Sequence, residues 1–206
     1  MDKAERIRNE KLGAGLIKSL SLRHFDAYYC ASSSEAAEKI LSLIPKTDVV
    51  SWGGSMTMEA LGVIDRVKKG GWRVIDRSTA QSQEEKIEIM RRALLCDTYL
   101  TGANAISEDG EIGNRVAAMT FGPKSVIVAC GMNKVVKTAE DAISRARNTA
   151  APVNAQRFDI RTPCKTTGSC VDCKSTDSIC SYIVRTRLCK PAGRIKVVLI
   201  GEALGF

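Results

Sequence analysis

The sequence predicts an α/β fold, a Rossmann-like and mainly parallel sheet with helices on both faces. Short β-branched runs such as residues 49–52, 125–129 and 195–200 alternate with longer segments whose apolar residues recur at helical spacing. This alternation is typical of βαβ units. The 206 residues can bury one large core, and no linker divides them. We therefore expect a single domain over residues 1–206, with a Cys-rich excursion at 161–190 before the last strand.

The order of the elements follows from apolar periodicity and from helix start and stop signals. Ser32 and Glu35 match a capping box, and two glycines at 70 and 71 end a helix. Strands are expected at residues 26–31, 49–52, 72–76, 96–101, 125–129 and 195–200. Helices are expected at residues 3–20, 32–43, from the turn after residue 52 to residue 69, and at 82–95, 116–120 and 137–147, with Pro152 closing the last region.

Composition narrows the class of protein. No apolar run reaches the ~18 residues of a membrane span, and the N-terminus lacks the apolar region of a signal peptide, so a cytoplasmic location and no membrane partner are expected. The net charge is +8, but aromatic residues are only 5% and no recognition motif is present, which disfavours nucleic acid as a partner. The single histidine, His24, excludes a His-pair zinc motif within the chain.

A glycine turn follows the second predicted strand. Gly53, Gly54 and Ser55 come directly after it, and Thr57 begins the next helix. In open α/β sheets ligands bind at the carboxyl ends of strands, where glycines permit close approach and free N–H groups bind anions. A plain turn with a serine N-cap explains the same residues. Neither the dinucleotide fingerprint nor the P-loop pattern is present.

Polar residues also follow two other predicted strands. The stretch 102–115 carries Gly102, Asn104, Asp109, Asn114 and Arg115 directly after a strand. A hairpin turn at residues 109–110 would explain part of it. Because the carboxyl ends of parallel strands share one edge, these groups are predicted to lie near the glycine turn.

Two carboxylates are candidates for catalytic roles at that edge. Glu202 follows the last strand, and Asp109 could orient a hydroxyl or act as a base. A solvated tail residue explains Glu202 equally well. Arg115 could pair with a carboxylate or phosphate.

Cysteines form a cluster in the excursion. Cys164, Cys170, Cys173 and Cys180 have the spacing C-x5-C-x2-C-x6-C, in basic surroundings that favour thiolates. Such a set can close around zinc or an iron–sulfur cluster. Its spacing is neither that of a zinc ribbon nor that of the usual ferredoxins, and unliganded or redox-active thiols and disulfides remain alternatives. Cys30, Cys96 and Cys130 lie on predicted strands as small buried hydrophobes.

Several motifs in one order give the chain a family resemblance. They read SWGGSMT, TGANAISEDG, GNRVAAMTFGPKSVIVACGMNKVV, NTAAPVNAQR, TPC…TGSCVDC…SIC and LIGEALGF. Together they resemble the lactate-utilization (LUD) domain family from about residue 5 to the end. The resemblance departs at one point, because related sequences usually carry more residues between the EDG and GNR elements than Glu111 and Ile112.

The resemblance implies a fold like that of the sugar-phosphate isomerase and CoA-transferase (NagB/RpiA-like) superfamily, with a cleft at the strand ends. It implies a role in lactate or carboxylate metabolism, with a small anionic ligand at Gly53, Gly54, Ser55 and Arg115 among others. It also implies an iron–sulfur protein partner in a lactate-oxidising complex. The alternative is a non-catalytic redox accessory protein that bears a metal or cluster. Pairing with a second copy of the chain is a further expectation.

Overall fold

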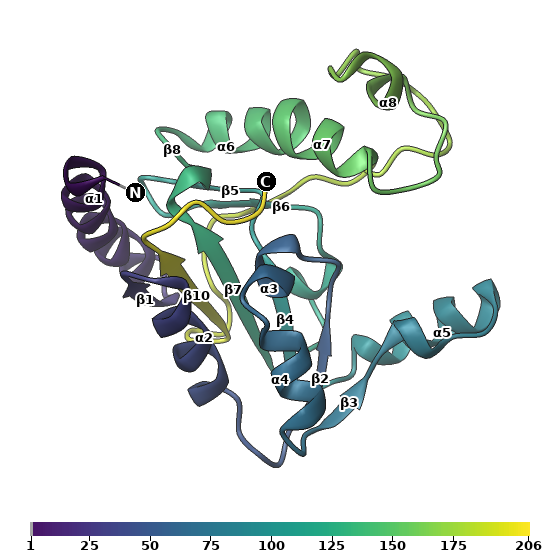
Figure 1. The fold of residues 1–206 in the computed structure, drawn as a ribbon, viewed down its shortest axis with the longest axis horizontal. Coiled ribbons are helices and arrows are strands. Elements are labelled where there is room, and N and C mark those ends of the chain that lie inside the picture. The colour runs from purple at the N-terminus through teal and green to yellow at the C-terminus, as the bar shows by residue number, and fades with distance from the viewer. Residues whose placement is uncertain (1) are drawn as a thin grey trace.

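The computed structural model describes residues 2–206 and contains a six-stranded parallel sheet at its centre (Figure 1). Every neighbouring pair in this main sheet is parallel, as the sequence predicted. The strands, in spatial order, are β1 (Asp26–Cys30), β10 (Ile195–Ile200), β7 (Ser125–Gly131), β4 (Thr98–Gly102), β2 (Val49–Trp52) and β3 (Arg73–Ile75).

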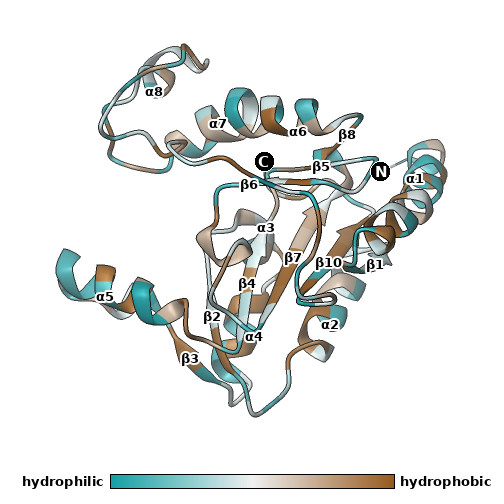
Figure 2. Ribbon diagram, turned by 180° about the vertical axis from the view of Figure 1, so that it is seen from behind, coloured by the Kyte–Doolittle hydropathy of each residue, from teal (hydrophilic) through white to brown (hydrophobic). Residues whose placement is uncertain are grey.

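The two central strands supply both faces of the core, because successive side chains of a strand point to opposite faces. In β7, Val126 and Val128 belong to one hydrophobic cluster, and Ile127 belongs to the other. Almost the whole of β7 and β10 is buried, as expected for a parallel sheet covered on both faces. Figure 2 shows the hydrophobic colour concentrated in these strands.

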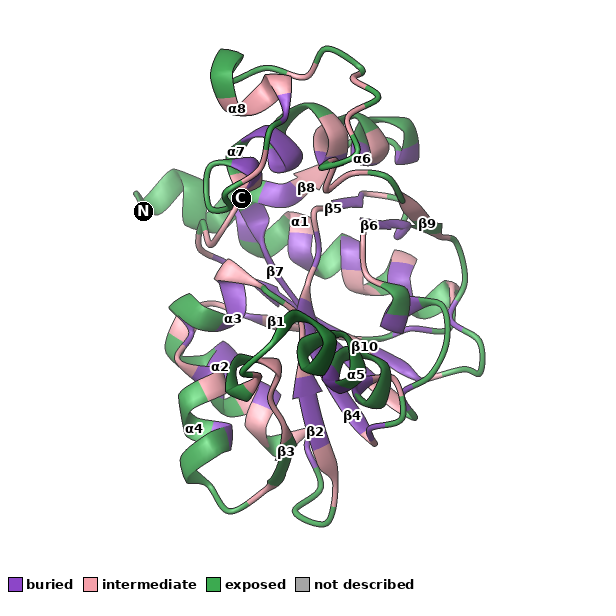
Figure 3. Ribbon diagram, turned by 90° about the vertical axis from the view of Figure 1, so that its right-hand side faces the viewer, coloured by how far each residue is buried: buried purple, intermediate pink, exposed green. Residues whose placement is uncertain are grey.

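Helices cover both faces of the main sheet. Leu16 and Leu20 of α1 pack in one cluster, whereas Ile40 of α2, Met58 of α3 and Val67 of α4 pack in the other. Figure 3 shows these helices buried on the side toward the sheet and exposed on the other. The helices are α1 (Lys3–Leu22), α2 (Ser33–Ser42), α3 (Met56–Ala60), α4 (Val63–Lys69), α5 (Gln83–Ala93), α6 (Ala139–Arg145), α7 (Ala151–Ala155) and α8 (Pro163–Thr167). None of the described helices is both long and apolar enough to cross a membrane.

A second, four-stranded sheet was not predicted from the sequence. Its strands in order are β8 (Val135–Val136), β5 (Ala105–Ser107), β6 (Ile112–Asn114) and β9 (Val184–Thr186). The polar stretch after β4 forms an antiparallel hairpin here, with Gly110 at a φ of 89° in its turn. Ile106 and Ile112 of this hairpin are completely buried in the same cluster as α1, so both sheets share one core.

Two helix predictions differ from the structure. Gly62, at a φ of 64°, interrupts the helix after the glycine turn, so that α3 and α4 are separate. Pro152 was expected to close the region of the helix at residues 137–147. Instead it lies in the first turn of α7, where its missing N–H is not needed. A π-helical segment, Ala146–Ala150, joins α6 to α7.

Candidate functional site

A cavity of about 720 Å³ opens at the carboxyl edge of the main sheet. We call it the turn cavity, because the glycine turn after β2 forms one wall, opposite the residues that follow β4 and β6. All eight predicted ligand-binding residues line it, namely Gly53, Gly54, Ser55, Thr57, Gly102, Asn104, Asn114 and Arg115. The structure therefore brings together segments that are about fifty residues apart in the chain.

The glycine turn is held against the end of β4. The Gly53 N–H donates to the Leu100 carbonyl oxygen at 3.0 Å, which continues the pairing of β2 with β4. A Cβ on Gly102 would lie 2.6 Å from Ser55 Oγ, closer than real contacts allow. Ser55 also caps α3, since its hydroxyl accepts from the Met58 N–H at 3.3 Å. Ser55 therefore both caps α3 and forms part of the cavity wall.

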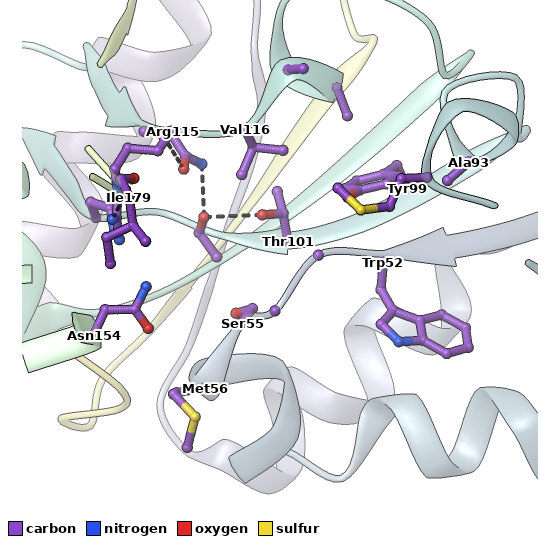
Figure 4. A pocket seen from close by; sticks show the side chains of 18 of the residues that line it. Trp52, Ser55, Met56, Ala93, Tyr99, Thr101, Arg115, Val116, Asn154 and Ile179 are labelled. Atoms are coloured by element: carbon purple, nitrogen blue, oxygen red, sulfur yellow. Dashed lines mark hydrogen bonds between the residues drawn. The ribbon is translucent and has the colours of Figure 1, made fainter. Parts of the chain in front are cut away.

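Arg115 lies half-buried at one end of the turn cavity, beside Ile179 (Figure 4). Its Nε donates to Asn104 Oδ1 at 3.2 Å and its Nη1 to the Ile179 carbonyl oxygen at 3.2 Å. It forms no ion pair within residues 2–206. Burial lowers the pKa of Arg115, and the nearby Cys180 side chain opposes that shift. Positive charge is thus held there without a compensating carboxylate.

Asn114 fixes the backbone around Arg115. Its Nδ2 donates to the Gly102 carbonyl oxygen at 2.8 Å, and its Oδ1 accepts from the Arg115 N–H at 2.6 Å. The side chain of Asn114 is committed to these two bonds in a buried position. Its role in this structure is to join the end of β6 to the end of β4 and so to position Arg115.

Lys134 is a second cation of the turn cavity, which the sequence analysis did not select. It is 2% exposed, and its Nζ donates to Thr57 Oγ1 at 2.7 Å. No carboxylate of the described chain forms an ion pair with it, and burial lowers its pKa. The signal that could have found it is its place just after β7, the central strand, at the edge where ligands bind.

The rest of the lining is cationic at several points and otherwise a mixture of polar and apolar residues. The cations are Arg77, Arg91, Arg115, Lys134 and Arg157, and no Asp or Glu side chain is among the lining residues. Apolar side chains form much of the wall at the far end from Arg115, where Figure 4 shows Trp52, Tyr99 and Ala93. Arg91 of α5 and Arg77, whose charge acts on Tyr99, also lie toward that end.

Asp109 and Glu202 do not line the turn cavity, although Glu202 follows the carboxyl end of β10 at the same edge of the main sheet, as expected. Asp109 Oδ2 accepts from Arg23 Nη2 at 2.9 Å, and Asp109 also bonds to the Ser107 hydroxyl. Glu202 Oε2 accepts from the Ser33 N–H at 3.1 Å and from the Ser33 hydroxyl.

The β5–β6 hairpin is the reason for the displacement of Asp109. It carries Asp109 away from the sheet edge to α1, where a Cβ on Gly110 would lie 2.9 Å from the backbone nitrogen of Leu20. The hairpin alternative weighed for residues 109–110 is therefore the one that the structure shows.

A second cavity, of about 590 Å³, is lined by the four clustered cysteines. Cys164, Cys170, Cys173 and Cys180 are all partly exposed and form no disulfides, whereas the other four cysteines are buried. We call it the cysteine cavity. Across residues 2–206, no three His, Cys, Asp or Glu side chains converge closely enough to hold one metal ion.

A family model identifies the family of the chain, and a solved structure supports its fold. Residues 14–200 match the family model for the LUD domain. The crystal structure of a DUF162 family protein from Deinococcus radiodurans is similar with a TM-score of 0.52 and 14% identity, and the match covers 95% of this chain and 98% of that one. That likeness shows the fold alone. Neither comparison tests the expected likeness to the NagB/RpiA-like superfamily, which stays a prediction.

A more distant match carries no structural argument. It is to the crystal structure of eIF2B delta from Chaetomium thermophilum, with a TM-score of 0.31, 18% identity, and coverage of 59% of this chain and 51% of that one. The search of curated proteins gave no match.

Proposed function

We propose, for a chain that belongs to the lactate-utilization (LUD) domain family, that the turn cavity binds a small anionic metabolite of the carboxylate class. The observation that carries the proposal is the charge of the cavity. Five cationic side chains line it and no acidic side chain does. Arg157 pairs with Glu59 and Arg91 is exposed, but Arg115 and Lys134 are desolvated and form no ion pair in the described chain. Desolvated cations without a partner are costly, and an anionic ligand would supply the missing partner of these two.

Two cations are the best placed to hold the anion. Arg115 and Lys134 are both linked to the backbone of Gly102. On one side Asn114, the neighbour of Arg115, donates to the Gly102 carbonyl oxygen. On the other side Thr57 accepts from Lys134, and its Oγ1 would lie 3.5 Å from a Cβ placed on Gly102. A guanidinium can bind both oxygens of a carboxylate in its planar fork, and an ammonium adds a point charge. Lactate and pyruvate are the carboxylates that the family association favours.

The apolar end of the turn cavity limits the remainder of the ligand. Trp52, Met90 and Tyr99 line that end, and a volume of about 720 Å³ exceeds what a three-carbon acid fills. We therefore expect a small carboxylate to occupy the end at Arg115 and Lys134.

Calorimetric titration with lactate, pyruvate and inorganic phosphate tests the proposal. Arg115→Ala should weaken carboxylate binding roughly ten- to hundred-fold, because a hydrogen bond to a charged group contributes about 1.5–3 kcal/mol. Arg115→Lys should lie in between, since it keeps the charge and loses the fork. Arg92→Ala, on α5 outside the cavity lining, is the matched control. Equal affinity in wild type and Arg115→Ala, or no binding of any of the three anions, would contradict the assignment.

A second candidate function is that of a redox accessory protein. The specific observation that favours it is that four free thiols line the cysteine cavity. On this proposal the chain acts beside an iron–sulfur protein partner in lactate oxidation.

A further inference from the structure

We propose that Cys164, Cys170, Cys173 and Cys180 are the ligands of an iron–sulfur cluster bound in the cysteine cavity. This inference deepens the redox-accessory candidate and does not depend on anion binding in the turn cavity. The first observation is that all four thiols line the same cavity. They come from α8 and from the loop after it, span seventeen residues, and nevertheless line one cavity of about 590 Å³.

The donor set, rather than the spacing of the thiols, favours a cluster. Four cysteines without a histidine are the ligands that iron–sulfur clusters commonly use, and each thiolate binds an iron at the periphery of a larger inorganic core. In the described residues no three candidate ligands stand around one point, as a tetrahedral zinc ion at ~2.3 Å from its thiolates would require. Binding of a cluster therefore requires the loop to close around it.

Positive charge stands beside the thiols. Arg147 lines the cysteine cavity and forms an ion pair with Asp172 at 2.5 Å. Lys174 also lines the cavity and forms an ion pair with the same Asp172 at 3.3 Å. Together these two cations exceed the charge of Asp172, and they would offset part of the negative charge that four thiolates bring to a bound cluster.

The segment that carries the cysteines has no core of its own. Residues 168–183 contain no helix or strand, and none of the four cysteines belongs to either hydrophobic cluster. Figure 3 shows α8 and the loop after it as a mixture of intermediate and exposed residues at the end of the molecule beyond α7. Long loops without secondary structure are uncommon in compact domains unless they serve a function. Metal–ligand bonds would supply the stability that packing does not.

The end of the loop nearest β9 is nevertheless held to the rest of the protein by two contacts. Arg185 of β9 forms an ion pair with the buried side chain of Glu111, the residue before β6. Just before β9, the Ile179 carbonyl oxygen accepts from Arg115 at 3.2 Å. Ile179 lines the turn cavity and Cys180 lines the cysteine cavity, so the two cavities share a wall. The cluster would therefore lie next to the anion site.

Anaerobic reconstitution tests the proposal. The full chain is treated with ferric iron, sulfide and dithiothreitol, which reduces part of the iron, and is then desalted. We expect iron and acid-labile sulfide in equal amounts, a broad visible absorption band, and a paramagnetic signal when dithionite is added. Each of Cys164→Ser, Cys170→Ser, Cys173→Ser and Cys180→Ser should lose most of the band and of the bound iron.

The matched control is Cys189→Ser. Cys189 is buried outside the cysteine cavity, and its Sγ bonds to the Pro191 carbonyl oxygen and the Ile195 N–H, both of which a hydroxyl can retain. This variant should keep the cluster. A second measurement uses only the wild type, so it does not depend on whether the serine variants fold. In the reconstituted protein the four thiols should resist alkylation, as measured for each cysteine peptide by mass spectrometry. They should become reactive once a chelator has removed the iron.

Three outcomes would overturn the proposal. The first is wild-type protein that retains no iron after desalting. The second is zinc bound without sulfide. The third is serine variants that hold as much cluster as Cys189→Ser. Because none of these measurements uses a carboxylate, failure of the cluster and failure of the anion site are separately detectable.

Discussion

The turn cavity and the cysteine cavity share a wall but are built in opposite ways. The turn cavity stands on the carboxyl ends of β2, β4 and β7, where buried strands and the hydrogen bonds of Asn114 hold its walls. The cysteine cavity is formed mainly by the loop after α8, with partly exposed thiols, and is completed by Arg147 and by Ala151 and Pro152 at the start of α7. A parallel sheet can preorganise a polar site through packing alone, whereas a segment without a core needs bonds to a ligand to become rigid.

The largest expected effect tests whether packing really differs between the two regions. Leu199→Ala changes a completely buried residue of β10. It should lower the free energy of unfolding by about 3 kcal/mol, because the substitution loses the transfer free energy of the buried side chain and leaves a cavity. Val171→Ala, beside the cysteines and 56% exposed, should change it by less than about 0.5 kcal/mol. Urea unfolding followed by circular dichroism measures both. Equal losses would show that the cysteine segment is packed like the core.

The next prediction concerns how the affinity of the turn cavity for an anion changes with pH. Burial lowers the pKa of Lys134 below its ordinary 10.5, and Arg145 adds to this while Cys130 opposes it. An anion binds the ammonium form better than the neutral amine. Affinity should therefore be highest below the lowered pKa and fall as the pH rises through it, earlier than for an ordinary lysine.

Lys134→Met is the variant that isolates this effect. It should bind carboxylates roughly tenfold more weakly, and this dependence on pH should disappear because the titrating group is gone. Calorimetry over a pH series gives both quantities. A wild-type affinity that does not change until the ordinary lysine pKa would show that Lys134 does not contact the anion.

The smallest effect tests the separation of Asp109 from the cavity. Burial opposes the shift, but the Ser107 hydroxyl and the Arg23 guanidinium together lower the pKa of Asp109 below its ordinary 3.8. A carboxyl with a lowered folded pKa contributes stability that is present above its unfolded pKa and is lost as the pH falls through the folded pKa. Asp109→Asn should thus cost less than about 1 kcal/mol at neutral pH, because the pair is half exposed, and this difference should disappear in acid.

Carboxylate affinity of Asp109→Asn should equal that of the wild type, since the β5–β6 hairpin keeps the side chain on Arg23 and away from the turn cavity. Thermal unfolding at several pH values and calorimetry at neutral pH check the two statements. A marked loss of affinity would return Asp109 to the site.

The sequence by itself determined the parallel sheet and the edge at which the turn cavity opens. Residues 49–52, 125–129 and 195–200 form runs typical of strands buried on both faces, and the turn at Gly53–Ser55 follows the first of them. Gly102, Asn104, Asn114 and Arg115 were expected near that turn because polar residues after parallel strands lie at the same edge, and all four line the turn cavity.

Only the tertiary structure decided what the long-range contacts do. The hairpin of β5 and β6 moves Asp109 to α1, and Glu202 turns to Ser33. Lys134 becomes a buried cation because the chain after β7 folds back over Thr57. Local propensity fixes where a strand ends, but the partner of a charged side chain depends on which distant segment packs beside it, and no local pattern carries that information.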